Sequence, residues 1–427
     1  MKKNNGTFPE HYKWNFTMGI VHGISFSFAM AFSEPFSILP IFLESFGISR
    51  ITIGLLISII KAGSALPQIF VANTLRTLKS GKPILFTAIW TRWLAWGIIS
   101  LSVFLWGDSS HSFILPVFVV MLFIYSFAGG VANVPFFNMI AKSIPPETRG
   151  TFFGLRQFLG GISAMGAGFL VRIILSLPSL KFPVNYGYLF LATFILLTFG
   201  YLALSLFREP EHQVNTSRQK ESTNLFTAFR YMRKYPSLRR VIFSQITSQG
   251  LFISMPFFVI YAKESLHFHP SMVGYFVIAR MAGGIISNFL WALLSNRYGN
   301  RIVVRLSSLS ALISLILAIT GHSMFTFLLV FIFIGFYYNG SSIGYNNYVM
   351  ELGDNIERPR LISIQGTMLF PIYFYPLAGG ILISHIGFIP TFFITLILLL
   401  FSFIFSLSLC EPRNGKESCI IVPSQSV

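Results

Sequence analysis

Charged residues are scarce in this sequence, and acidic ones are the scarcest. Only 11% of the 427 residues are charged, with 14 Asp and Glu against 31 Lys and Arg, whereas soluble domains carry roughly 25% charged residues. Hydrophobic residues make up 54% of the chain, and its mean hydropathy is +0.69. This composition excludes a water-soluble fold.

Clusters of metal-binding or catalytic side chains are also missing from the sequence. Cys410 and Cys419 are the only cysteines, so a cysteine-based metal site is not expected. A membrane enzyme would need a His/Asp pair, a metal cluster or a catalytic carboxylate near the membrane surface, and no such grouping stands out. We therefore expect no metal, no cofactor and no enzymatic activity.

Long apolar runs, separated by short polar stretches, dominate what remains. A helix needs about 20 apolar residues to cross the hydrocarbon core of a membrane. Runs bounded by Gly, Pro and charged residues predict six helices at 17–44, 51–74, 83–106, 113–140, 151–176 and 187–207. A second six are predicted at 239–262, 270–294, 302–320, 323–350, 361–385 and 388–410. The sequence therefore predicts an all-α integral membrane protein with twelve transmembrane helices.

The basic residues of the predicted loops lie almost entirely on one side of the membrane. Only Arg50, Lys181 and Lys263 fall in loops on the opposite side. Because short cytoplasmic loops are enriched in Lys and Arg, we expect a multi-pass protein of the inner (plasma) membrane with both termini in the cytoplasm. The net charge of +17 therefore reflects topology, and no nucleic-acid partner is expected.

One long polar stretch divides the predicted helices into two sets of six. The expected parts are an N-terminal bundle at 1–207, a cytoplasmic linker at 208–238, a C-terminal bundle at 239–410 and a cytoplasmic tail at 411–427.

Two loops repeat at a shift of about half the chain. The loop 75–82 aligns with 293–300, which puts Lys79 over Arg297 and Gly81 over Gly299. The segment Glu-Thr-Arg-Gly at 147–150 likewise falls over Glu-Arg-Pro-Arg at 357–360. Such self-similarity indicates two copies of one six-helix unit.

The second copy of the first loop carries a recognisable motif. Its sequence Ala-Leu-Leu-Ser-Asn-Arg-Tyr-Gly-Asn-Arg at 292–301 resembles the Gly-x-Leu-x-Asp-Arg-x-Gly-Arg-Arg signature of the major facilitator superfamily. Arg297, Gly299 and Arg301 match, whereas Asn296 lacks the carboxylate that the family has at that position. The stretch 144–154 is similar to the helix 4 to 5 connection of many bacterial members.

This resemblance extends over nearly the whole chain. It implies the major facilitator fold, in which two pseudo-symmetric six-helix bundles form a secondary transporter. It also implies a cytoplasmic gate, whose candidate residues here are Lys79, Gly81, Arg149, Gly150, Arg297, Gly299 and Arg301.

Three charged residues fall at the depth where carriers bind their solutes. Glu34, Lys61 and Arg280 each lie ten residues from the outer end of a predicted helix, which is about 15 Å and close to the midplane of a ~30 Å core. A charge there costs roughly 2.5 to 3.5 kcal/mol, so each must be paired or solvated. We predict that Glu34 carries a coupled proton, and that Lys61 and Arg280 either bind an anionic or zwitterionic solute or exchange partners with Glu34. The alternative is a static buried ion pair.

Other buried polar positions have simpler expected roles. Arg92 lies among three tryptophans, where stacking on aromatic faces is expected. Arg156 lies near a helix end and is expected to extend to the membrane surface, and His22 is expected to be a core histidine. Gly283 and Gly284 favour close contact between helices.

The resemblance implies that helices 1, 4, 7 and 10 line a central cavity. Polar side chains on these helices that could hydrogen-bond or stack on a solute are Asn133, Gln245, Gln249, Asn339 and Tyr345. The alternative is hydrogen bonding between helices, worth about 0.6 kcal/mol for each bond.

We therefore predict a secondary active transporter, either a symporter or an antiporter. It would move a small organic solute by alternating access, coupled to protons through Glu34, with membrane lipids around it. Two alternatives remain open: a polytopic membrane enzyme acting on lipid or glycosyl substrates, and a transport-inactive sensor that keeps the carrier fold.

Overall fold

The structure is a computed structural model that describes residues 10–65, 67, 81–107, 111–208, 225–354 and 357–414. These residues are built from α-helices with four short 3-10 helices, and helical segments occur at all twelve predicted spans. Within the described ranges, 10 helices are long and apolar enough to cross a membrane. The predicted all-α membrane fold is therefore confirmed.

The chain forms two compact units. The first comprises Met1–Glu34 and Ile59–Arg218, and the second comprises Pro35–Ser58 and Gln219–Val427. Each unit is described separately below. The predicted boundaries of bundles, linker and tail stay predictions.

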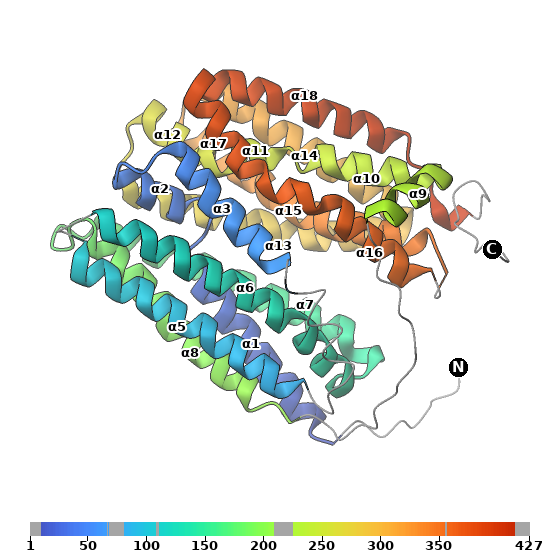
Figure 1. The fold of residues 1–427 in the computed structure, drawn as a ribbon, viewed down its shortest axis with the longest axis horizontal. Helices are drawn as coiled ribbons and strands as arrows, with labels where there is room; N and C mark the ends of the chain where they lie inside the picture. The colour runs from blue at the N-terminus through green and yellow to red at the C-terminus, as the bar shows by residue number, and fades with distance from the viewer. Residues whose placement is uncertain are drawn as a thin grey trace. The chain divides into compact units, whose positions relative to one another are not determined.

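The first unit is an assembly of long helices (Figure 1). Its members are α1 (Tyr12–Ala31), the second part of α3 (Arg50–Ala65), α5 (Lys82–Trp106), α6 (His111–Ser143), α7 (Pro146–Ser176) and α8 (Val184–Ser205). Helix α5 packs against α6 and α8, and α1 packs against α7 and α8. A proline in the first turn of α5 and of α7 suits a helix start, because the first N–H groups of a helix have no partner inside it.

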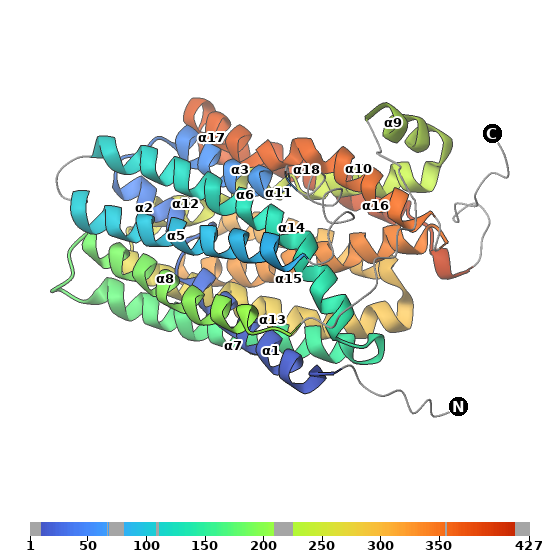
Figure 2. The ribbon, with the colours of Figure 1, turned by 60° about the horizontal axis from the view of Figure 1, so that its bottom comes forward.

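The second unit contains the remaining helices (Figure 2). They are α2 (Ile38–Ser45), the first part of α3, α9 (Leu225–Lys234), α10 (Pro236–Ser248), α11 (Leu251–Ser254), η1 (Met255–Phe257), α12 (Phe258–Leu266), η2 (Pro270–Met272), α13 (Val273–Tyr298), α14 (Asn300–Thr320), α15 (Met324–Glu351), α16 (Arg358–Leu369), η3 (Phe370–Phe374), α17 (Tyr375–Ile386), α18 (Phe388–Leu407) and η4 (Pro412–Asn414). Helix α15 packs against α13 and α14, and α18 packs against α10 and α14.

Close helix contact in the second unit depends on glycine. A Cβ atom added to Gly283 of α13 would lie 2.2 Å from the carbonyl oxygen of Ile332 in α15. A Cβ atom on Gly335 of α15 would lie 2.3 Å from the carbonyl oxygen of Arg280. The backbones of α13 and α15 therefore touch, which confirms the close contact predicted at Gly283.

Three predicted spans are interrupted. The span 17–44 divides into α1 and α2 with a non-helical segment at 32–37, and the span 361–385 passes through η3 between α16 and α17. A continuous helix at 17–44 is wrong, whereas the span 361–385 lies within one membrane-length helical segment, Arg360–Ile386. Proline explains both breaks, because Pro35 and Pro371 lack the N–H that an α-helix requires and clash with the preceding turn. The third interruption, at η1, contains Pro256.

Part of the predicted linker belongs to the folded second unit. Helix α9 lies within 208–238, and its residues Ala228 and Met232 are buried in a cluster with residues of α10, α15 and α16. Residues 209–224 lie outside the described part of the chain.

Candidate functional site

Glu34 lies in the non-helical segment between α1 and α2 rather than inside a helix. Its residue is only 1% exposed. Helix α1 ends at Ala31, three residues earlier, and Pro35 follows directly. The predicted burial of this carboxylate is therefore found, at a point where the backbone leaves the helix.

The two predicted solute-binding cations lie in different units. Lys61 is half-buried and lies on the part of α3 that belongs to the first unit. Glu34 belongs to the same unit. Arg280 is half-buried on α13 of the second unit, where its guanidinium lies over the rings of Phe36 at 5.9 Å and Tyr338 at 5.8 Å. Aromatic faces therefore provide one electrostatic contact for Arg280. The predicted roles of Lys61 and Arg280 in binding stay predictions.

Hydrogen bonds between helices engage three of the five polar residues predicted to contact solute. The Tyr345 hydroxyl and Ser244 Oγ are 2.9 Å apart, and Gln365 Nε2 donates to Gln245 Oε1 at 2.8 Å. Asn339 Nδ2 donates to the carbonyl of Gly284 at 2.9 Å. These bonds match the alternative stated for these residues, which is hydrogen bonding between helices. Their predicted contacts with solute stay predictions.

The other two polar candidates, Asn133 of α6 and Gln249 after α10, are half-buried. Their predicted contacts with solute stay predictions.

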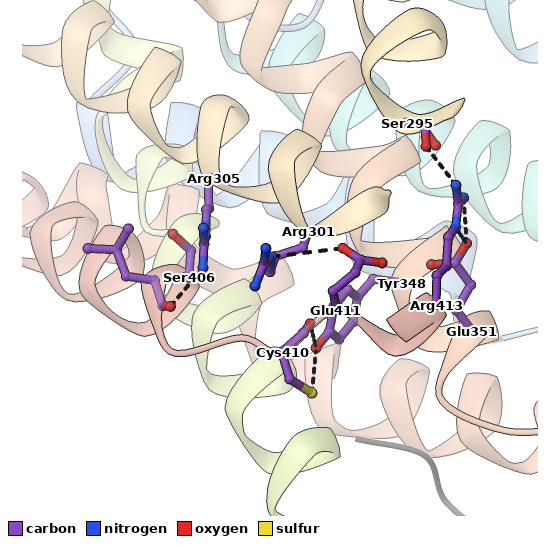
Figure 3. Close-up of polar contacts among 10 residues, drawn as sticks. Ser295, Arg301, Arg305, Tyr348, Glu351, Ser406, Cys410, Glu411 and Arg413 are labelled. Atoms are coloured by element: carbon purple, nitrogen blue, oxygen red, sulfur yellow. Dashed lines mark hydrogen bonds and ion pairs between the residues drawn. The ribbon is translucent and has the colours of Figure 1, made fainter. Parts of the chain in front are cut away.

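The motif of the second repeat forms the short connection between α13 and α14, which is called the junction below. Gly299 joins the two helices with φ +83° and ψ 172°, a conformation that is essentially restricted to glycine. Two residues on, Arg301 Nε lies 3.8 Å from Glu411 Oε2 (Figure 3). A carboxylate is therefore present at this junction, although Asn296 does not provide one. Sequence reasoning missed Glu411, although it is the first charged residue after the last span.

Further contacts tie the segment that follows α18 to this junction (Figure 3). Arg413 Nη2 lies 2.7 Å from Glu351 Oε1, and Arg413 Nη1 donates to the carbonyl of Ser295 at 2.8 Å. Arg305 of α14 donates from Nη2 to the carbonyl of Leu407 at 2.8 Å, at the last turn of α18. A cation at that position satisfies carbonyls that have no partner inside the helix.

The electrostatics of this junction centre on Glu411. Its residue is 7% exposed. Burial raises the pKa of the Glu411 carboxyl, and the nearby Glu351 carboxylate adds to this effect. Arg301 and Arg413 oppose the rise because they favour the charged form.

The first-unit members of the predicted gate are more dispersed. Arg149, in the first turn of α7, donates from Nε to the carbonyl of Ile144 at 2.8 Å and so caps the end of the preceding helix. Gly81 precedes α5, and Gly150 is exposed on α7. Lys79 lies outside the described residues.

Arg297 of the second repeat is exposed, and its guanidinium lies over the ring of Tyr298 at 5.2 Å. It therefore makes a local contact on its own helix.

Arg156 departs from its prediction. It does not extend to the membrane surface, because its Nη2 lies 3.2 Å from His22 Nδ1 and its guanidinium lies 5.1 Å from the centre of the Phe136 ring. Gly23 makes room for this course: a Cβ there would lie 2.1 Å from Arg156 Cγ, so any other residue would require the arginine side chain to shift.

Arg92 stacks on aromatic rings as expected, but not on the tryptophans beside it in the sequence. Its guanidinium lies 4.3 Å from the centre of the Tyr125 ring and 5.3 Å from that of Phe26. Its Nη2 donates to the Tyr125 hydroxyl at 2.6 Å. The partners come from α6 and α1, so they could not be read from the sequence around Arg92.

Metal-binding groups are absent from the described part of the chain. There, no three His, Cys, Asp or Glu side chains come together in a group that could hold a metal ion.

Three solved structures that share this fold are transporters. A D-xylose-proton symporter superimposes with a TM-score of 0.67 at 14% identity, covering 95% of this chain and 98% of that one. A mutant of the nucleoside transporter NupG gives 0.66 at 13% identity, covering 93% and 98%. The human organic anion transporter MFSD10 gives 0.63 at 13% identity, covering 92% and 99%.

Sequence comparison agrees with the structural likeness. No curated protein matches the chain significantly. The model of the Major Facilitator Superfamily, however, matches residues 21–262 and 241–418, which together span both repeats. With its apolar helices, the protein is a multi-pass membrane transporter. The chain belongs to the Major Facilitator Superfamily.

Proposed function

We propose that the protein is a secondary active transporter, not an enzyme, and that it moves a small organic solute by alternating access with protons coupled through Glu34. The asymmetry of basic residues between loops supports a place in the inner membrane with both termini in the cytoplasm.

The observation that carries this proposal is the pair of interrupted spans. The first span of the first repeat breaks at 32–37, and its counterpart in the second repeat passes through η1 at Met255–Phe257. Pro35 and Pro256 correspond within a few residues under the half-chain shift of the repeats. Interrupted helices at matching positions are typical of the solute and ion sites of secondary transporters.

Glu34 is the acidic residue at this break. Non-helical backbone at membrane depth occurs where it is buried in protein or lines a water-filled cavity, which suits a carboxylate that exchanges protons. The burial of Glu34 supports a coupling role, because a protonated carboxyl is far cheaper to carry through an apolar environment than a charged one.

An anionic or zwitterionic solute is the second part of the proposal. Lys61 and Arg280 lie in spans and are candidates to hold a negatively charged group, with Gln249 and Asn133 as polar contacts. The relatives with this fold are named for nucleosides, organic anions and a sugar, so the fold by itself does not select the solute.

A cytoplasmic gate is the third part. The junction of Gly299, Arg301 and Glu411 supports this role in the second unit, because a charged contact joins two membrane helices to the segment that follows α18.

Transport in proteoliposomes tests the proposal. A thermal-shift screen of metabolites on the purified protein would first select the solute. A pH gradient imposed across the vesicles should then drive its accumulation by the wild type. Glu34→Gln should abolish this accumulation while leaving exchange of solute across the membrane, which needs no net proton movement. Glu147→Gln, which removes an exposed carboxylate of the first unit, is the control and should transport normally.

Other outcomes would reject parts of the proposal. Gradient-insensitive transport, or gradient-driven transport by Glu34→Gln, would exclude coupling through this residue. Folded protein that transports nothing would favour the sensor, and turnover of a lipid or glycosyl substrate would favour the enzyme.

A further inference from the structure

Three helices of the first unit bring two arginines to one histidine. Arg156 Nη2 lies 3.2 Å from His22 Nδ1, and both Arg92 and Arg156 lie within Coulombic range of the imidazole. Because arginine can only donate, Nδ1 accepts and the neutral ring carries its proton on Nε2. The cluster therefore holds two positive charges and a further donor.

The three residues lie at one level of the bundle. His22, Arg92 and Arg156 are each ten residues from the first residue of their helix, Tyr12 of α1, Lys82 of α5 and Pro146 of α7. At 1.5 Å per residue, this places all three about 15 Å along helices that run in the same direction. That is about half the thickness of a ~30 Å hydrocarbon core.

Hydrogen-bond donors around His22 lack acceptors. Arg92 Nε, Arg156 Nε and the Tyr201 hydroxyl are buried and have no hydrogen-bond partner among the residues that the structure describes. The Tyr201 residue is 1% exposed, its ring centre lies 6.3 Å from that of His22, and it lies within Coulombic range of Arg92. Buried donors without acceptors are rare in proteins, and each calls for an explanation. Two of these donors belong to the guanidinium groups themselves, and together with the Tyr201 hydroxyl they indicate a missing acceptor.

No protein carboxylate fills this role in the described part of the first unit. The acidic residues there are Glu10, Glu34 and Glu147. Glu34 lies beyond the end of α1, which is itself nine residues, about 14 Å, past His22, and Glu147 is nine residues before Arg156, about 14 Å away along α7. Neither arginine forms an ion pair with them, and a buried charge without a partner is costly.

Aromatic rings hold the arginines in place. Phe26 and Phe136 each lie against one guanidinium and against the His22 ring, at centroid distances of 5.8 Å and 5.6 Å from it. The Tyr125 hydroxyl accepts from Arg92 and donates to Met30 Sδ. Guanidinium groups fixed in this way are well suited to bind a carboxylate or phosphate, whose oxygens match their planar donors.

We propose that His22, Arg92, Arg156 and Tyr201 form a binding site for the carboxylate or phosphate group of the transported solute. The identification of the anion with the solute rests on the proposed transport function. The binding of an oxyanion follows from the cluster itself.

Binding to the purified full-length protein tests the site without requiring transport. The protein is placed in nanodiscs of phosphatidylcholine, and calorimetry measures the affinity for inorganic phosphate, glycerol 3-phosphate and succinate, with uncharged glycerol for comparison. At least one oxyanion should bind and glycerol should not. Arg92→Gln and Arg156→Gln should each weaken binding at least tenfold. Arg172→Gln removes an arginine from the far part of the same helix α7 and should bind as the wild type does.

Folding is controlled separately. Circular dichroism and size-exclusion chromatography show whether each variant is intact. Tyr201→Phe removes only one unpartnered hydroxyl, so it should fold normally and weaken oxyanion binding several-fold. This variant keeps the test decisive if an arginine substitution disrupts the bundle.

The results separate this proposal from the proposed function. Absence of oxyanion binding, or equal binding by the intact variants, overturns the site. Stabilisation by phosphatidylglycerol nanodiscs alone, with no soluble oxyanion bound, assigns the site to a lipid headgroup and overturns its assignment to the solute. Oxyanion binding that depends on Arg92 and Arg156 in a protein that transports nothing supports the site and rejects the transport function.

Discussion

The backbone of Gly299 lies directly against the carboxylate of Glu411. A Cβ atom at this position would lie 2.4 Å from Glu411 Oε1. The same glycine has a backbone conformation that other residues avoid, with φ +83° and ψ 172°. Both the conformation and the contact therefore require glycine at this point of the family motif.

Gly299→Ala should destabilise the protein more than Gly387→Ala. Gly387 has nearly the same conformation, φ +84° and ψ 177°, but a Cβ there would meet nothing within 4 Å. Both substitutions should cost about 1–3 kcal/mol in backbone strain. Only Gly299→Ala also displaces Glu411 from Arg301. Thermal unfolding in detergent measures the difference, which should disappear when both variants also carry Glu411→Ala. Equal losses from the two glycines in the wild-type background would contradict the contact.

Glu411→Gln should change how stability depends on pH. Because burial raises the pKa of this carboxyl above its usual 4.5, the folded protein binds more protons than the unfolded chain between the two pKa values. The Glu411 contribution therefore falls as pH rises through that window. Melting temperatures between pH 4.5 and 8 should decline more in the wild type than in Glu411→Gln. Glu264→Gln, which removes an exposed partner of Arg50, should decline as the wild type does.

Tyr345 and Gln249 should respond differently to substitution. Tyr345→Phe removes the hydrogen bond to Ser244 and should lower stability by roughly 0.6–1.5 kcal/mol, with the KM for solute unchanged. Gln249→Ala should leave stability unchanged and raise the KM about tenfold, which corresponds to roughly 1.4 kcal/mol of lost binding. Thermal unfolding and uptake kinetics on the same preparations test both. A raised KM in a stable Tyr345→Phe would assign that hydroxyl to the solute instead.

The order and nature of the helices could be predicted from the sequence, because apolar length and loop charge are local signals. The break at Glu34 could not, since Pro35 stands within an apolar run that is otherwise long enough for one helix. Tyr345 and Asn339 show a second limit. A polar side chain inside a span is the same signal whether it bonds a solute or a neighbouring helix.

Arg156 shows a third limit, since its inward course depends on a residue far away in the chain. Its distance from the helix end favours a side chain that reaches the membrane surface. The space that the inward-pointing side chain occupies is left open by Gly23, which lies on another helix and 133 positions earlier in the chain. Such complementarity between distant residues has no pattern along the sequence.

Gly283→Ala should destabilise the second unit by about 1–3 kcal/mol, because the added methyl group meets the carbonyl of Ile332 and must push α15 away from α13. Gly166→Ala on α7 is the matched control, since nothing lies within 4 Å of a Cβ at that position. It should be neutral or slightly stabilising, because alanine favours helix more than glycine does. Similar losses in thermal unfolding would show that the α13–α15 contact is less tight than described.

Arg92 and Arg156 also give the first unit an electrical property. They carry two positive charges into a membrane-spanning bundle, and in its described residues no carboxylate pairs with them. Moving one elementary charge through a potential of about 100 mV changes the free energy by roughly 2.3 kcal/mol. A rearrangement that displaced the empty cluster through this field would depend on voltage. With a doubly charged anion bound, the same movement would involve little electrical work. The voltage dependence of each step would then report whether the carrier is loaded.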